Sequence, residues 1–257
     1  MDMSSWRLRL GLPKATFYLL ALCIVVYLLQ VVSANMLHLR LEGVFGLSVA
    51  GAMQGKLWQF ATYQFLHGSP FHLFVNMLMF YFLGSEVERA IGIRHFLTLY
   101  FLSGILGGLG WLLLTYPYEG VCVGASAAIF GLLSAFAVLF PQRRVTLLLF
   151  FIIPITLKAW VLAVGLGVIQ LLFTISPGVG GIAYSAHLAG ALAGLIYTLA
   201  IFRPGLIADA VSKTKASNVR KRNERTARRN TAKRAEVDRL LEKITREGIH
   251  SLTPRRT

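Results

Sequence analysis

Residues Phe17–Met36 read FYLLALCIVVYLLQVVSANM, a stretch of 20 residues without a charged side chain. A helix needs about 20 apolar residues to cross the hydrocarbon core of a bilayer, so this stretch is long enough to span a membrane. The rest of the chain has a similar character: of its 257 residues 56% are hydrophobic and 14% are charged, against roughly 25% charged residues in soluble domains. The composition excludes a soluble monomer and predicts an all-α polytopic membrane protein.

The hydropathy pattern predicts six transmembrane helices. The expected spans are Phe17–Met36, Phe71–Ala90, Phe96–Tyr116, Cys122–Phe140, Lys158–Ile175 and Ile182–Phe202. The 13-residue segment Val145–Leu157 contains Pro154 and is too short to cross the membrane. We expect it to be interfacial or re-entrant and to lead into the fifth span.

The distribution of Lys and Arg predicts the orientation, because these residues are retained on the cytoplasmic side of short loops. With the N-terminus inside, 24 Lys and Arg residues face the cytoplasm, and 2, Arg40 and Lys56, lie in outer loops. If the C-terminal residues 203–257 are left out, the ratio is 8 to 2. We therefore expect both termini in the cytoplasm. Met1–Lys14 is short and basic, and no small-residue cleavage site follows it, so we expect a retained anchor rather than a cleaved signal peptide.

Four polar residues of three spans share one expected depth: His72 and Asn76 in the second span, Ser126 in the fourth and His187 in the sixth. All three spans run inwards from the outer surface, and Ser126 and His187 lie roughly 7 Å below it at about 1.5 Å per residue. Each residue has a structural alternative, such as a serine bonded to its own helix or an asparagine that joins two helices. The shared depth favours a functional site, because polar groups inside spans are costly.

These residue types fit acyl transfer without a metal or cofactor. A serine hydroxyl needs a base to accept its proton, and a neutral imidazole is the usual base near neutral pH. Ser126 and His187 are therefore predicted to form a catalytic dyad. His72 and Asn76 are one helical turn apart and can both donate hydrogen bonds to an oxyanion.

The other chemistry-bearing side chains fall outside this layer. Glu119 lies in an outer loop and Glu86 near the inner end of the second span, so neither is expected to complete a triad. Cys23 and Cys122 lie in apolar stretches, which excludes a disulfide scaffold and a cysteine-based zinc site.

A ridge of small residues follows His187. Gly190 and Gly194 form a GxxxG pattern, which allows close approach to the small residues Ala127, Ala128 and Gly131 of the fourth span. Such packing is expected to bring His187 within hydrogen-bonding distance of Ser126.

Three motifs together resemble the rhomboid intramembrane serine proteases. They are HGSPFHLFVN at His67–Asn76, GASA at Gly124–Ala127 and AHLAGALAG at Ala186–Gly194. The resemblance covers residues 15–202 and implies a six-helix rhomboid bundle that cleaves single-span membrane proteins near the outer leaflet. It implies that Ser126 is the nucleophile and His187 the general base and acid, and that His72, Asn76 and the Ser126 N–H form the oxyanion hole.

The resemblance also implies a structural role for His67 and a membrane-dipping loop around Leu57–Gln64, where Trp58 and Tyr63 would suit an interfacial position. Ala127 stands where the commonest form of the family has glycine, which raises the question of whether its methyl group crowds the site. Both dyad residues are present, so we predict an active serine endopeptidase. The alternative is an inactive rhomboid-like scaffold that binds transmembrane clients; a small transporter is less well supported, because the spans offer no ionisable residue at mid-membrane depth.

The C-terminal tail, residues 203–257, carries 16 Lys and Arg against 6 Asp and Glu. Ser217–Lys233 is expected to be a solvated helix or disordered, and to bind anionic lipid headgroups. No nucleic acid is expected as a partner, because no aromatic side chains interleave the charges. Val237–Leu252 has helical spacing up to Gly248 and resembles a short C-terminal motif of some bacterial rhomboids. The length and general character of the chain suggest a bacterial inner membrane. The predicted order is a cytoplasmic N-terminus (1–14), a membrane domain (15–202) and this tail.

Overall fold

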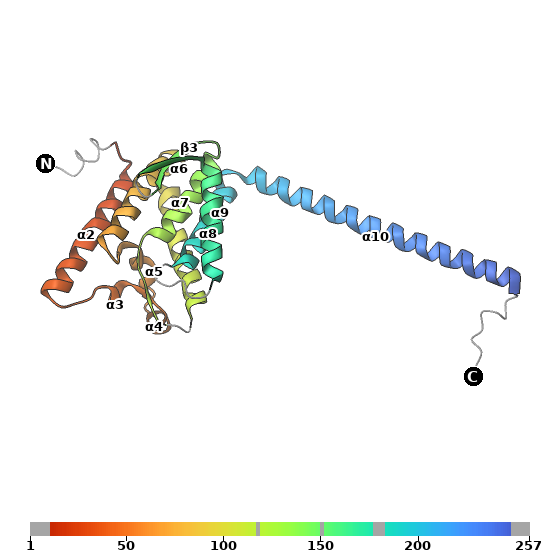
Figure 1. Cartoon of the computed structure of the whole chain (residues 1–257), viewed down its shortest axis with the longest axis horizontal. Coiled ribbons are helices and arrows are strands. Elements are labelled where there is room, and N and C mark those ends of the chain that lie inside the picture. The colour runs from red at the N-terminus through yellow and green to blue at the C-terminus, as the bar shows by residue number, and fades with distance from the viewer. Residues whose placement is uncertain (1–10, 117–118, 150–151, 177–182, 248–257) are drawn as a thin grey trace. The chain divides into compact units, whose positions relative to one another are not determined.

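The computed structural model describes residues 11–116, 119–149, 152–176 and 183–247, and these are mostly helical (Figure 1). The chain divides between Phe202 and Arg203 into two compact units. Most of the predicted cytoplasmic N-terminus, the start of the sixth predicted span and the predicted helix end at Gly248 lie outside the described residues.

Five helices of the first unit follow the six predicted spans. Helix α2 (Lys14–Met36) covers the first, and α6 (Pro70–Thr115) runs through the second and third. Gly92 divides α6 with φ 76° and ψ 162°, a left-handed conformation that favours glycine. The other three are α7 (Ser126–Leu139), α8 (Ala159–Ile175) and α9 (Tyr184–Phe202).

Three of the described helices, α2, α6 and α9, are long and apolar enough to cross a membrane. The 46 residues of α6 suffice for two crossings of about 20 residues each. Helices α7 and α8 are shorter, with 14 and 17 residues. The predicted fourth span begins too early, because Cys122 belongs to strand β2 (Val121–Cys122) and Gly124, with φ 125°, precedes the helix.

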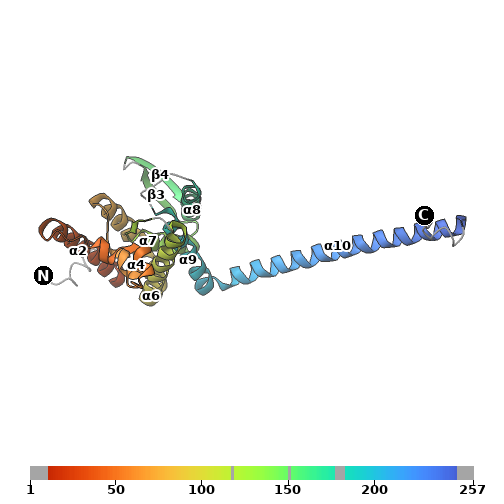
Figure 2. The ribbon, with the colours of Figure 1, turned by 90° about the horizontal axis from the view of Figure 1, so that it is seen from below.

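The segment Val145–Leu157 forms an antiparallel hairpin. Strand β3 (Arg144–Leu149) pairs with β4 (Ile153–Lys158), and Figure 2 shows both strands beside α8. Proline has no backbone N–H to donate to a neighbouring strand. Pro154 is tolerated because both strands of a two-stranded sheet are edge strands, in which not every N–H is paired. The hairpin leads directly into α8, as expected for a segment that precedes the fifth span.

Short elements connect α2 to α6. They are α3 (Glu42–Phe45), β1 (Leu47–Ser48), α4 (Val49–Met53), α5 (Gln59–Thr62) and the 3₁₀ turn η1 (Tyr63–Phe65), and β1 pairs with β2. Trp58 is exposed, but the expectation that Tyr63 lies at the membrane interface is wrong. Tyr63 is fully buried, and its hydroxyl donates a hydrogen bond to the Gly104 carbonyl oxygen at 2.6 Å. A buried phenol needs such a partner, so Tyr63 ties this loop to α6.

Helices α6, α7 and α9 pack against one another, and α9 approaches α7 backbone to backbone. A Cβ atom on Gly190 would lie 2.2 Å from the Ala127 carbonyl oxygen, and one on Gly194 would lie 2.3 Å from that of Gly131. Only residues without a side chain permit such an approach.

In the second unit the structure describes residues up to 247, and these contain one helix, α10 (Pro204–Glu247), which is continuous over 44 residues. It includes the whole of Ser217–Lys233, so this stretch is helical rather than disordered. Val237, Leu240 and Leu241 are exposed on it.

Candidate active site

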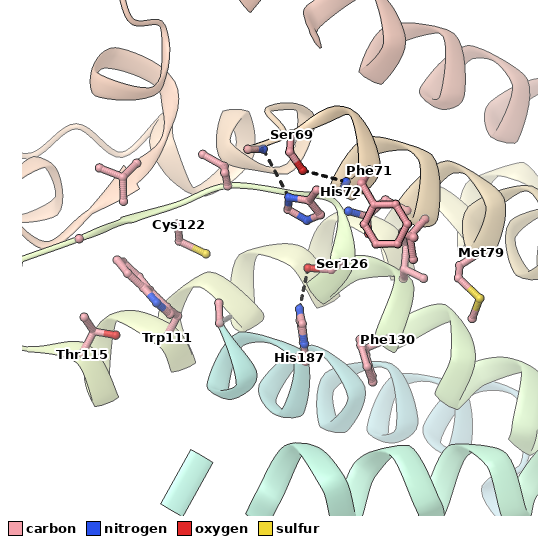
Figure 3. Close-up of a pocket in the computed structure, with 18 of the residues that line it drawn as sticks. Ser69, Phe71, His72, Met79, Trp111, Thr115, Cys122, Ser126, Phe130 and His187 are labelled. Atoms are coloured by element: carbon pink, nitrogen blue, oxygen red, sulfur yellow. Dashed lines mark hydrogen bonds between the residues drawn. The ribbon is translucent and has the colours of Figure 1, made fainter. Parts of the chain in front are cut away.

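Ser126 and His187 face each other at the start of two neighbouring helices. Ser126 is the first residue of α7, and His187 lies in the first turn of α9 (Figure 3). The Ser126 Oγ and His187 Nε2 atoms are 2.7 Å apart, which is a hydrogen bond. The sequence places these residues 61 positions apart, and the close packing of α9 on α7 brings them together.

Two further residues hold the His187 imidazole. Its Nδ1 atom is 2.9 Å from Oε1 of Gln170 in α8, and the Phe130 ring stacks on it with centroids 4.6 Å apart and planes inclined by 11°. The sequence analysis missed both. A polar residue within the fifth predicted span was the available signal for Gln170, whereas Phe130 is one of many apolar residues in its span.

His72 lies beside the serine in the close-up of Figure 3. The Ser69 Oγ atom caps α6 by accepting from the His72 backbone N–H at 3.1 Å, and the His72 Nδ1 atom accepts from the Gly68 N–H at 3.4 Å. The His72 Nε2 atom therefore carries the hydrogen in the neutral ring. A Cβ atom on Gly124 would lie 2.9 Å from this Nε2 and 3.7 Å from the Ser126 Oγ, so glycine at this position lets His72 reach the serine.

Asn76 is buried one turn further along α6, and its Nδ2 atom has no hydrogen-bond partner among the described residues. A buried amide donor without a partner is costly, so such a group points to a ligand or a catalytic role. Asn76 also lines the same cavity as Ser126 and His187.

His67 does not line this cavity. It is buried, its ring packs edge-to-face with that of His72 with centroids 5.2 Å apart, and its backbone N–H donates to Gln30 Oε1 at 3.0 Å. Burial, together with the neighbouring His72, lowers the pKa of His67 to about 4, so this ring is neutral at physiological pH.

Ser126 and His187 line a cavity of about 1270 Å³. Its walls are largely apolar, with Phe71, Val75, Met79, Trp111, Ile129, Phe130, Leu133 and Leu166 among them. Glu119, expected outside the layer of the site, lines this cavity as well, whereas Glu86 forms ion pairs with Arg89 and Arg143. An apolar cavity with a few convergent polar groups suits a hydrophobic polypeptide segment.

The methyl group of Ala127 points away from this cavity. A Cβ atom on Gly107 of α6 would lie 2.6 Å from the Ala127 Cβ, and Ala127 is not among the residues that line the cavity. The methyl therefore occupies the contact between α7 and α6. Within the described ranges, no group of three or more His, Cys, Asp or Glu side chains could hold a metal ion.

The sequence is similar to those of known proteins. A family model described as the rhomboid domain matches residues 54–204. YdcA of Bacillus subtilis is 37% identical over 135 residues, which are 52% of this chain and 66% of YdcA. Rhomboid protein 1, mitochondrial, of Saccharomyces cerevisiae is 33% identical over 146 residues, which are 52% of this chain and 38% of the yeast protein. Rhomboid protease GluP of Bacillus subtilis is 28% identical over 199 residues, which are 76% of this chain and 36% of GluP. The chain thus matches less than two thirds of the length of each of these relatives.

Proposed function

The chain belongs to the rhomboid family, and from this membership and the site we propose that it is an intramembrane serine endopeptidase with a Ser126–His187 dyad. The observation that carries the proposal is the 2.7 Å hydrogen bond between Ser126 Oγ and His187 Nε2 beside an apolar cavity. The substrates are transmembrane segments of membrane proteins, single-span proteins among them, and the cleaved bond lies near the outer leaflet. Relatives named rhomboid protease support this substrate class.

The proposed reaction begins with attack of the Ser126 Oγ atom on the carbonyl carbon of the scissile peptide bond, while His187 Nε2 accepts the hydroxyl proton. The negative charge that develops on the carbonyl oxygen is stabilised by N–H donors. Asn76 Nδ2, His72 Nε2 and the Ser126 backbone N–H supply them. His187 then gives its proton to the leaving amine, the C–N bond breaks, and water hydrolyses the acyl-enzyme by the same route.

The chain is an integral membrane protein, and we propose residues 15–202 as its catalytic membrane domain, with six spans and both termini in the cytoplasm. A bacterial inner membrane is the proposed location. We propose that α10 binds anionic lipid headgroups, since Arg220, Arg222 and Arg225 are exposed on it and a basic residue near such a surface contributes about 1 kcal/mol.

A fluorophosphonate probe tests the dyad without knowledge of the substrate. The activated Ser126 Oγ forms a bond to phosphorus and fluoride leaves, so the purified protein is expected to be labelled. Ser126→Ala and His187→Ala should abolish labelling. Ser85→Ala is the matched control, because Ser85 is a buried serine of α6 whose hydroxyl donates to its own helix, and this variant should label like the wild type.

Cleavage of a single-span protein in liposomes, with the same variants, then tests the endopeptidase activity. Folded wild-type protein that is neither labelled nor cleaves would overturn the proposal in favour of a rhomboid-like scaffold that binds clients without turnover.

A further inference from the structure

The ring nitrogen of His187 that faces away from Ser126, Nδ1, has a hydrogen-bond partner on a third helix, α8. The Nδ1 atom lies 2.9 Å from Oε1 of Gln170, and both side chains are buried, with exposed fractions of 9% and 7%. We propose that Gln170 is a positioning residue that fixes the tautomer and the orientation of His187. The inference rests on the proposed function, since it concerns the base of the proposed dyad.

Fixing the tautomer decides whether His187 can act as a base. A neutral imidazole has one N–H donor and one acceptor nitrogen. His187 can accept the Ser126 proton only at an unprotonated Nε2, so its hydrogen must be on Nδ1. The Gln170 Oε1 atom is an acceptor only, so it favours this tautomer and disfavours the other.

The burial of Gln170 is itself unusual for its helix. Throughout α8, which is described in full, three residues are buried: Ala159, Leu162 and Gln170. Gln170 is the polar one among them, while apolar residues such as Val168 and Leu171 are exposed on the same helix. A polar side chain that turns inwards in an apolar helix indicates a function.

A neutral amide suits this position better than a carboxylate would. It orients the ring and places the negative end of its carbonyl dipole beside the imidazolium that forms in the reaction, without a second buried charge. Phe130 covers one face of the ring, and Ser126 and Gln170 hold its two nitrogens. These three contacts together restrict rotation of the ring about both side-chain torsions.

Three variants separate positioning from packing. Gln170→Leu keeps the approximate size of the side chain but removes the acceptor, and Gln170→Glu keeps an acceptor at the same reach. Leu162→Ala removes a buried contact of α8 about two helical turns before Gln170. The two main measurements on the full chain in detergent are the rate constant of fluorophosphonate labelling against pH and the tautomer of His187 by ¹⁵N-histidine NMR. The thermal midpoint, and kcat and KM in the cleavage assay, are measured for the same variants. His187→Ala assigns the signal.

Gln170→Leu is expected to slow labelling about 10- to 100-fold, the usual effect of removing a partner that orients a functional histidine. In the cleavage assay kcat falls while KM stays within about twofold, because the lost group never touches substrate. Gln170→Glu restores most of the rate and moves the acid limb of the profile to higher pH, because a carboxylate favours the protonated imidazole. Leu162→Ala lowers the thermal midpoint and leaves the profile unchanged.

The two readouts distinguish failure of this inference from failure of the proposed function. Gln170→Leu that labels at the wild-type rate with the wild-type profile overturns the positioning role, and so does an Nε2–H tautomer in the wild type. Wild-type protein that does not label, but shows an Nδ1–H tautomer that Gln170→Leu loses, overturns the proposed function and supports the positioning role.

Discussion

Replacing Gly190 by alanine is expected to separate the proposed dyad without touching either of its residues. The new Cβ atom would lie 2.2 Å from the carbonyl oxygen of Ala127 and 2.8 Å from its carbonyl carbon. Both are backbone atoms of α7, which cannot rotate aside as a side chain could. An ordinary contact begins at 3.4 Å, so α9 must withdraw by about 1.2 Å, the difference between 3.4 and 2.2 Å.

His187 lies one turn before Gly190 on α9, so it moves with the helix. Withdrawal by this amount lengthens the 2.7 Å distance between Ser126 Oγ and His187 Nε2 beyond the range of a hydrogen bond. A misplacement of about 1 Å costs on the order of 100-fold in rate. The overpacked contact itself lowers the free energy of unfolding by about 1–3 kcal/mol.

The assay is the rate constant of fluorophosphonate labelling, with the thermal midpoint measured on the same samples. Gly165→Ala is the matched control, because a Cβ atom at Gly165 of α8 meets nothing within 4 Å. It adds the same methyl group to an apolar helix without a steric conflict, so it should leave the labelling rate unchanged and should not lower the thermal midpoint. Gly190→Ala protein that labels at the wild-type rate would refute the claim that backbone contact of α9 with α7 sets the dyad distance.

Three further predictions concern single groups. Asn76→Ala should slow labelling by about 100- to 1,000-fold if its unpartnered Nδ2 is an oxyanion donor; normal labelling by a poorly folded variant would make its role structural. Glu88→Gln weakens the acceptor of the N–H groups of Ala15 and Thr16 at the start of α2, so chemical denaturation should show a loss of about 1–3 kcal/mol with unchanged labelling. The pKa of His67 falls from 6.5 to about 4 on folding, so between these two pH values the unfolded state binds a proton that the folded state does not. The thermal midpoint should therefore fall as the pH drops from 6.5 to about 4. His67→Gln should flatten this dependence on pH, and an equally steep profile in that variant would contradict the prediction.

The family and the helical positions could be predicted because their signals are local. Long apolar stretches mark the helices, and the motifs around His72, Ser126 and His187 are contiguous pieces of sequence. The break at Gly92 and the hairpin within Val145–Leu157 depend on backbone conformation, which hydropathy does not report. A short apolar segment with a proline is compatible with several conformations.

The contacts made by single polar residues could not be predicted in the same way. An aromatic residue in a loop between spans suggests the membrane interface, but the Tyr63 hydroxyl finds the Gly104 carbonyl 41 positions later. Gln170 is equally compatible with a bond to its own helix or to any neighbour. Its contact with His187 depends on how α8 lies against α9, and no pattern within either helix encodes that.

The question raised by Ala127 is answered by residues on two other helices. A Cβ atom on Gly107 of α6 would meet the Ala127 Cβ at 2.6 Å and the Ala186 carbonyl oxygen at 2.9 Å, and Gly190 of α9 approaches the Ala127 backbone. Gly107 and Gly190 bring no side chain to this junction of α6, α7 and α9. The methyl of Ala127 therefore fills the space that Gly107 leaves between α7 and α6, and α9 contacts the Ala127 backbone instead, while Ser126, the residue before it, faces the cavity.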